Sequence, residues 1–306
     1  MIIRGVLSVI PIFADKYVMR SEKFRYALFF GLAFLFPPFA EAGRVYEASF
    51  LDHFLRSPDQ CAAEKASNRD LKFSAERNKR LQYDLKWAVP GQLQIGWKIY
   101  RPLIAHFLRT EAPVESEAFA NAVARWQLVS GVRNPPDGII DADTLMSIFV
   151  ELQSKRLFDT KPPEANIVSI PLSRFYDPEK ERSRMKIGQE TFAAYEDMLR
   201  AARKAGIRGD FLKIISGYRS PSRQKELESR YGPDRVRLAK NTSHATGRAI
   251  DIYVGGVPVS TKNSNRELQS QTDAYRWLVR NAEKFGFVPY YFEPWHWEYV
   301  GPGNQD

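Results

Sequence analysis

The stretch Thr242–Ile252, TSHATGRAIDI, decides the fold that we expect for the C-terminal part of this chain. It holds one of only four histidines among the 306 residues, and Asp251 follows His244 seven positions later. The apolar residues around Asp251 are typical of a buried strand, and Gly247 suits a close backbone approach at the turn before it. A histidine and an aspartate at a strand edge form a candidate metal site, although this pair alone is also compatible with an ordinary loop.

A second stretch, FEPWHWEYV at residues 292–300, supplies Glu293 and His296 in an aromatic segment that we expect to form a strand. Together with His244 and Asp251, His296 completes two imidazoles and one carboxylate, a set that hydrolytic zinc sites use while keeping a position for water. Glu293 is then a spare carboxylate that can take a proton from this water and pass it to a leaving amine. Because residues three apart on a strand point to opposite faces, we expect a bend before His296.

Helical and strand patterns alternate between these stretches without an internal repeat. Helical spacing of apolar residues predicts helices over 190–206, 221–232 and 272–287, and short apolar runs predict strands within 211–220, 249–254 and 295–300. We therefore expect an α+β domain with a small mixed sheet over residues 157–306.

A separate small all-α unit is expected over residues 91–156. Apolar residues at helical spacing predict one helix around Trp126, which we expect to lie in a core, and a second helix capped by Asp141. An Asp-Gly turn at residues 137–138 joins them. Residues 43–90 are charged with a thin apolar stripe, so we read them as a linker or peripheral helical segment.

The N-terminus has the layout of a secretory signal peptide. An apolar run over residues 26–36 ends at the small-x-small sequence Ala40-Glu41-Ala42, and it follows three basic residues, Arg20, Lys23 and Arg25. We expect cleavage after Ala42, which leaves no stable membrane span. An uncleaved anchor is the alternative, although the run is short for a bilayer and two prolines follow it. Met19 raises the alternative that residues 1–18 are an over-extended start.

The net charge and the distribution of basic residues limit the kinds of partner that we expect for this chain. The formal net charge of +9 favours an anionic partner, and a bacterial cell wall, a membrane surface and nucleic acid all qualify. Because no run of five or six Lys and Arg is present, we do not expect nucleic acid. Cys61 is the only cysteine, so the chain has no internal disulfide and must be held by packing.

Three stretches, SGYRSPSRQ, TSHATGRAIDI and EPWHWEYV, resemble in this order the VanY-type D-alanyl-D-alanine carboxypeptidases. These are zinc peptidases of the LAS group, which also contains D-Ala-D-Ala dipeptidases and phage L-Ala-D-Glu endopeptidases, and the resemblance implies their hedgehog/D,D-peptidase-like fold. It implies one zinc ion per chain on His244, Asp251 and His296, with Glu293 as general base. It also implies that Arg219 contacts the carboxylate of the substrate or the developing oxyanion, as a permanently charged guanidinium can.

The same resemblance implies further substrate contacts. Gln224 matches a polar position beyond Arg219, and Thr242 stands where the family has serine, with Ser243 beside it. Threonine keeps the hydroxyl, so a supporting hydrogen bond can persist. We therefore expect Gln224, Thr242 and Ser243 to contribute to substrate binding.

The run AVARWQLVSGVRNPPDGIIDADTLMSI at residues 122–148 resembles the peptidoglycan-binding module found beside many cell-wall hydrolases. The resemblance implies that residues 91–156 hold the wall polymer and are separable from the catalytic domain. We therefore expect a periplasmic or extracellular zinc peptidase that acts on peptidoglycan stem peptides. The activity that we expect in the first place is that of a D-alanyl-D-alanine carboxypeptidase. The alternatives are a peptidoglycan endopeptidase of D,D or L-Ala-D-Glu type and a non-catalytic wall-binding protein with a structural zinc.

Overall fold

The computed structural model describes residues 70–89, 92–157, 166–177, 185–220 and 243–302, and single residues at 179, 222, 225, 226 and 229. The chain divides into two units, Met1–Ser67 and Asn68–Asp306, and every described residue belongs to the second. The predicted signal segment, Cys61 and most of the helix predicted over 221–232 lie outside the described residues. In the described part, no helix combines the length and apolar character that a membrane crossing needs.

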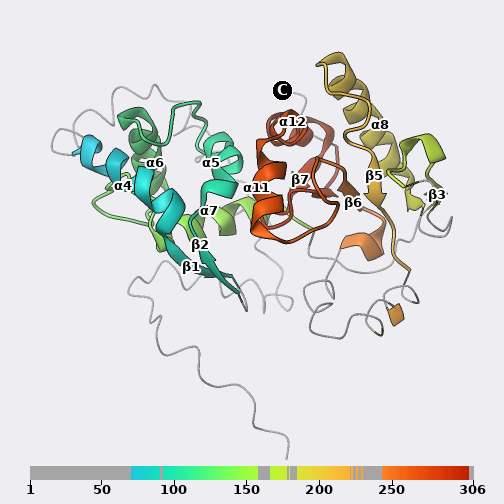
Figure 1. Ribbon diagram of the computed structural model, residues 1–306, viewed down its shortest axis with the longest axis horizontal. Helices are drawn as coiled ribbons and strands as arrows, with labels where there is room; N and C mark the ends of the chain where they lie inside the picture. Colours follow the sequence, from blue (N-terminus) through green and yellow to red (C-terminus); the bar gives the residue numbers. More distant parts are fainter. Residues whose placement is uncertain are drawn as a thin grey trace, which may run out of the picture. The chain divides into compact units, whose positions relative to one another are not determined.

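The N-terminal part of the second unit is mainly helical (Figure 1). Its elements are α4 (Leu71–Asp84), β1 (Lys86–Val89), β2 (Gln92–Ile95), a 3-10 turn (Lys98–Tyr100), α5 (Arg101–Phe107), α6 (Glu117–Ser130) and α7 (Ala142–Ser154). The predicted cap is confirmed, because the Asp141 side chain accepts a hydrogen bond from Thr144 N. The expected all-α composition is wrong in one respect. Strands β1 and β2 pair as an antiparallel hairpin, and β2 lies inside the segment expected to be helical.

Helix α4 packs against α6, and it lies beside α6 in Figure 1. Its Asn78 is fully buried, donates to Gly138 O at 2.8 Å and accepts from Ile140 N at 2.8 Å. Gln127 of α6 is also fully buried and holds the other side of this loop, accepting from the Gly138 backbone N–H at 2.8 Å. Trp126 is 3 % exposed, which confirms that it is a core residue. The stretch 71–84 is therefore a structural helix, since a buried amide that lost these bonds would be costly.

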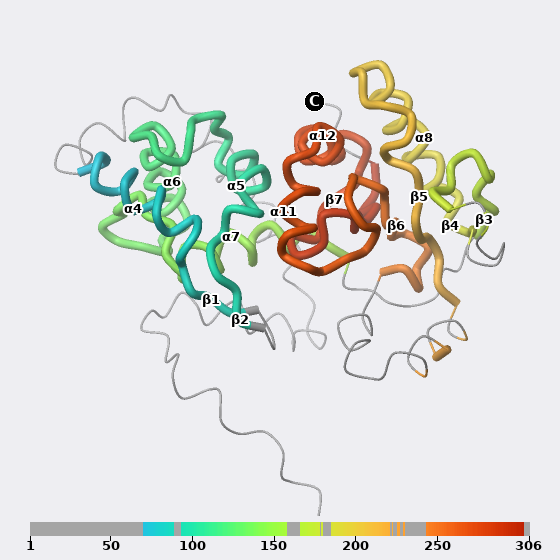
Figure 2. The backbone as a smooth tube through the Cα atoms, in the orientation of Figure 1, coloured from blue at the N-terminus to red at the C-terminus, as the bar shows by residue number. Residues whose placement is uncertain are grey.

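The C-terminal part is a small sheet covered by helices. It contains β3 (Ile167–Ser169), β4 (Lys186–Gly188), α8 (Gln189–Lys204), β5 (Ile214–Ser216), β6 (Ala249–Ile252), α11 (Asn263–Gln271), α12 (Asp273–Asn281), β7 (Phe287–Pro289) and β8 (His296–Tyr299). Its 3-10 turns are Leu172–Arg174, Ser243–Thr246 and Ala282–Phe285. Strands β3 and β4 form a hairpin, visible side by side in Figure 2. The fold class is α+β, as expected.

The central sheet has the order β5-β6-β8-β7, and all of its pairings are antiparallel. The expected mixed sheet is therefore corrected to an antiparallel one. A parallel pairing among the described residues is limited to an isolated bridge between Phe175 and Ile214. The register places Asp251 of β6 opposite both Ser216 of β5 and His296 of β8, so three strands meet at this point.

The helical part and the sheet part share buried side chains. Phe292, which precedes β8, is 5 % exposed and packs in the hydrophobic cluster of the helical part. Arg266 of α11 is fully buried, lies 4.0 Å from the centre of the Phe292 ring and donates to the Tyr100 hydroxyl. The structure therefore differs from the expectation of a separable module. Removing residues 91–156 would take away the Tyr100 hydroxyl and expose Phe292 to water, and exposure of such a buried apolar side chain costs about 1.5–3 kcal/mol.

Candidate metal centre and active site

Two neighbouring strands and one 3-10 turn bring the predicted ligands together. Asp251 and His296 lie opposite one another on β6 and β8, and His244 lies in the turn that precedes β6. All three are nearly fully buried, with exposed fractions of 4 % or less. One ligand atom from each lies within 4.8 Å of the others. The sheet register therefore assembles a compact cluster of two imidazoles and one carboxylate, the set that a hydrolytic zinc ion prefers.

Gly247 allows the turn before β6, as its sequence context predicts. Its φ of +71° lies in the left-handed region that favours glycine, and a Cβ there would stand 2.7 Å from Ile167 Cδ1. Its carbonyl also accepts from Gly188 N at 2.9 Å, so the backbone before β6 touches the end of β4 here. This close approach fixes the path of the chain between His244 and Asp251.

The outer nitrogen of each histidine is held by a hydrogen-bond acceptor. His244 Nδ1 lies 2.7 Å from Gly217 O, and His296 Nε2 lies 3.1 Å from Glu298 Oε1. The remaining nitrogens, His244 Nε2 and His296 Nδ1, face Asp251 Oδ1 at 3.2 and 3.0 Å. A histidine that donates one N–H outward presents its other nitrogen as a free ligand. The donor set and its orientation therefore fit a zinc ion held by His244, Asp251 and His296.

Charges within the cluster favour the metal-binding state of His244 and Asp251 but favour a protonated His296. Burial, reinforced by the nearby Arg219 guanidinium, lowers the pKa of His244 to about 4, so His244 is neutral at pH 7. Burial alone would raise the pKa of Asp251, but the two imidazoles lower it far below its usual range and keep it ionised. Burial also opposes the charged form of His296, yet its bonds to Asp251 and Glu298 raise its pKa to about 9. Binding of a cation would therefore displace a proton from His296.

Glu293 is the carboxylate that remains unengaged. It lies in a turn, where its N–H donates to Tyr290 O at 3.2 Å and its carbonyl accepts from His296 N at 2.9 Å. This turn is the bend expected before His296. Burial raises the pKa of Glu293, and its charge interacts with those of His296 and Asp251. Across the described residues, no side chain donates a hydrogen bond to this carboxylate, so it is free to accept one from water.

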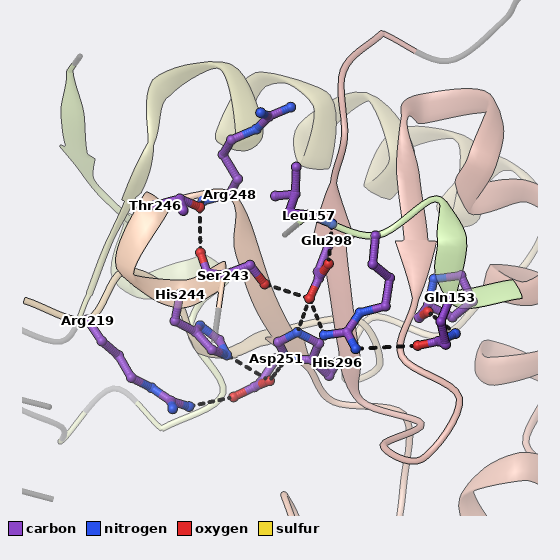
Figure 3. Close-up of polar contacts among 12 residues, drawn as sticks. Gln153, Leu157, Arg219, Ser243, His244, Thr246, Arg248, Asp251, His296 and Glu298 are labelled. Atoms are coloured by element: carbon purple, nitrogen blue, oxygen red, sulfur yellow. Dashed lines mark hydrogen bonds and ion pairs between the residues drawn. The ribbon is translucent and has the colours of Figure 1, made fainter. Parts of the chain in front are cut away.

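Arg219 approaches the cluster from the segment after β5. Its Nη2 lies 3.3 Å from Asp251 Oδ2, on the side of the carboxylate away from the histidines (Figure 3). Its side chain is 21 % exposed, so it is neither a surface residue nor sealed inside. The guanidinium can orient Asp251 and still present its other N–H groups to a bound anion.

Glu298 also belongs to the site, although the motifs described above do not include it as a functional residue. It is fully buried, accepts from Ser243 Oγ at 2.6 Å and from Leu157 N at 3.0 Å, and forms an ion pair with Arg156. The signal for it was present, since residues two apart on a strand share a face and Glu298 follows His296 by two.

The expected substrate contact from Ser243 is corrected by this arrangement. Its side chain is 1 % exposed and its hydroxyl donates to Glu298, so Ser243 supports the metal centre through Glu298 and does not face a substrate. Gln224 and Thr242 lie outside the described residues. The structure thus brings together Arg219, His244, Asp251, Glu293 and His296, the five residues that the resemblance marked for metal binding and chemistry.

Comparison with known proteins points to the same part of the chain. Residues 184–302 match the family model described as VanY: D-alanyl-D-alanine carboxypeptidase. This segment contains the five residues above, so the metal cluster lies in the part of the chain that is similar to the VanY-type carboxypeptidases. The peptidoglycan-binding resemblance of residues 91–156 is not reproduced in these matches.

Two curated relatives extend this likeness. The chain is 31 % identical over 160 residues to "Putative carboxypeptidase YodJ" of Bacillus subtilis (strain 168), covering 45 % of this chain and 55 % of that protein. It is 28 % identical over 134 residues to a D-alanyl-D-alanine carboxypeptidase of Enterococcus faecalis (strain ATCC 700802 / V583), covering 35 % of this chain and 45 % of that protein. The chain thus spans about half the length of the curated relatives it matches.

Two solved structures are also similar. One is the LdcB LD-carboxypeptidase, with 29 % identity, a TM-score of 0.36, and coverage of 47 % of this chain and 72 % of that one. The other is a mutant of the vancomycin resistance D,D-pentapeptidase VanY, from a VanB-type resistance cassette, in complex with Zn(II). It has 26 % identity, a TM-score of 0.27, and coverage of 46 % of this chain and 86 % of that one.

Proposed function

We propose that this protein is a zinc-dependent peptidase of bacterial peptidoglycan stem peptides, and that it removes the terminal residue of a D-alanyl-D-alanine end. The observation that carries the proposal is that the three carboxylates at the centre, the buried Asp251 and Glu298 and the half-buried Glu293, have different partners. Asp251 faces both histidines and Glu298 is saturated by donors, whereas Glu293 has no side-chain donor among the described residues. A site that held zinc only for structure would have no use for a free carboxylate beside it.

The residues divide the chemistry as follows. Zinc held by His244, Asp251 and His296 would polarise the peptide carbonyl and acidify a water molecule. Glu293 accepts the proton of that water on its carboxylate and then donates it to the nitrogen of the departing D-alanine. Burial favours this proton-holding form, because it raises the pKa of Glu293. Arg219 supplies positive charge to the carboxylate of the substrate or to the oxygen that becomes negative.

Arg219 offers a test of specificity for a free C-terminus. Arg219→Ala should lower kcat/KM for a D-Ala-D-Ala peptide by about 10- to 100-fold, because a hydrogen bond to a charged group contributes about 1.5–3 kcal/mol. The loss should be much smaller for the same peptide with an amidated C-terminus. Steady-state kinetics on the two peptides measure the difference. Equal losses on both would assign Arg219 to the oxyanion or to Asp251 instead.

The bond that is cut is identified by mass spectrometry of purified wall fragments after digestion. The proposal expects loss of one alanine mass from pentapeptide stems. Stems split internally, or separated cross-links, would make the protein an endopeptidase with the same centre. Intact fragments, with zinc bound near one per chain, would leave a non-catalytic metal protein.

We further propose that the chain is exported, cleaved after Ala42 and retained at the wall with the help of residues 91–156. The signal-like N-terminus and the positive net charge support this. In cells that produce the protein, the mature chain should begin at Gly43 and should sediment with insoluble wall at low salt. N-terminal sequencing of the wall fraction checks both points. A chain that retained residues 1–42 in the membrane fraction would favour an anchor.

A further inference from the structure

Residues 156 and 157, which follow the C-terminal end of α7, contact the metal centre although they lie far from its ligands in the sequence. The guanidinium of Arg156 forms an ion pair with Glu298, 142 residues further along the chain. The neighbouring Leu157 N–H donates to the other carboxylate oxygen of Glu298 at 3.0 Å. Arg156 also lies over the ring of Tyr290, 4.2 Å from its centre. Figure 3 shows Glu298 between this segment and His296.

Burying the Glu298 carboxylate at this position would carry a large free-energy cost without such partners. It is fully buried, and an unpaired carboxylate in an apolar interior would take up a proton. Donors meet both of its carboxylate oxygens, because Arg156 and Ser243 contact Oε1 and the Leu157 N–H contacts Oε2. Glu298 therefore stays an acceptor on both oxygens. An acceptor at this place obliges His296 to turn its N–H outward and its Nδ1 toward Asp251.

We propose that Glu298 is a positioning residue for the metal ligand His296, and that Arg156 and the Leu157 N–H, from the helical part of the chain, hold Glu298 in place. Ser243 adds a further donor, because its hydroxyl donates to Oε1 of Glu298, the oxygen that Arg156 also contacts. Ser243 directly precedes His244 in the sequence. The inference rests on the proposed metal centre. It makes the segment just after α7 part of that centre, so the helical part contributes to zinc binding as well as to packing. Loss of such an outer partner commonly costs 10- to 100-fold in metal affinity.

A matched control lies at the adjacent residue. Lys155 forms an ion pair with Glu283 at 2.6 Å, which also joins α7 to the sheet part, but both side chains are about 60 % exposed and neither touches the centre. If Arg156 acts only as a tether between the two parts, Lys155→Ala and Arg156→Ala should change zinc binding alike. If it acts through Glu298, the Arg156 variant alone should change it.

The experiment measures the zinc dissociation constant of the full chain by competition with a chromophoric chelator. The melting temperature of the metal-free protein is recorded beside it. Glu298→Gln and Arg156→Ala should each weaken zinc binding by about 10- to 100-fold, Arg156→Lys should recover part of the loss, and Lys155→Ala should match wild type. A cobalt-substituted sample should show a changed visible spectrum for Glu298→Gln and an unchanged one for Lys155→Ala.

Zinc affinity of Glu298→Gln within about twofold of wild type would overturn the role of Glu298, since an outer partner of a ligand should matter more than that. Equal affinities for Arg156→Ala and Lys155→Ala would overturn that of Arg156, and Arg156→Gln provides the same comparison where Arg156→Ala does not fold. The proposed peptidase function fails in a different way. There, wild-type protein would bind zinc and respond to these substitutions as expected but would cleave no stem peptide.

Discussion

Replacing Glu293 with glutamine should lower kcat by about 10² to 10⁴ while zinc stays near one per chain. Glutamine keeps the shape of the side chain but cannot accept a proton, and a base that also delivers the leaving-group proton should lie at the upper end of this range. Because the carboxylate accepts no side-chain hydrogen bond in the described part of the chain, the substitution should leave the fold unchanged. Turnover of a D-Ala-D-Ala peptide and zinc content by atomic emission measure the two quantities.

Glu283→Gln is the control for this experiment, because Glu283 is a 60 % exposed carboxylate of the same part of the chain, paired with Lys155. It should keep both zinc and activity. Loss of zinc from Glu293→Gln would make Glu293 a ligand. Full activity with zinc retained would remove the general base from the proposal, and Glu298 could not replace it without giving up the donors that saturate it.

Replacing any one of His244, Asp251 and His296 with alanine should reduce bound zinc from about one per chain to near zero and bring turnover to the background rate. Each supplies one of only three protein ligands, so the loss of any one should greatly weaken zinc binding. Zinc at about 100 times its dissociation constant should stabilise the wild-type fold by about 2.7 kcal/mol, and this stabilisation should vanish in the variants. Zinc content, turnover and thermal unfolding with and without added zinc measure these effects.

His106→Ala is the matched control, since His106 is an exposed histidine at the end of α5. It should keep zinc, activity and the zinc-dependent rise in melting temperature. Treatment with a chelator should remove activity from wild type and from this control, and added zinc should restore it in both. Zinc retained at full occupancy in two of the three ligand variants would refute the proposed centre.

The sequence indicated the metal cluster because its parts are local. His244 and Asp251 lie seven residues apart, in one turn and the strand that follows it. Glu293 and His296 lie three residues apart, in a second turn and the strand that follows that turn. Residue type and short spacing are visible in a sequence, and so are the caps and apolar faces of α6 and α7. The sequence could not show that β6 and β8 are neighbours with Asp251 opposite His296, because strand order depends on how the whole sheet packs.

Three interpretations changed for the same reason. The sheet is antiparallel, the Ser243 hydroxyl is bonded to Glu298 inside the protein, and the helical part shares a core with the sheet part. Each depends on contacts between segments far apart in the chain. Local patterns carry no record of such contacts, so they could predict the elements but not their neighbours.

By itself, the sequence determined the α+β class, the positions of most described helices and strands, and the residue types that can bind and use a zinc ion. Only the tertiary structure decided which nitrogen of each histidine faces Asp251, which carboxylate stays free, and that Arg156 reaches Glu298. The physical reason is burial. A charge inside the protein needs a partner within hydrogen-bonding distance, and folding can bring that partner from 142 residues away, where no spacing rule applies.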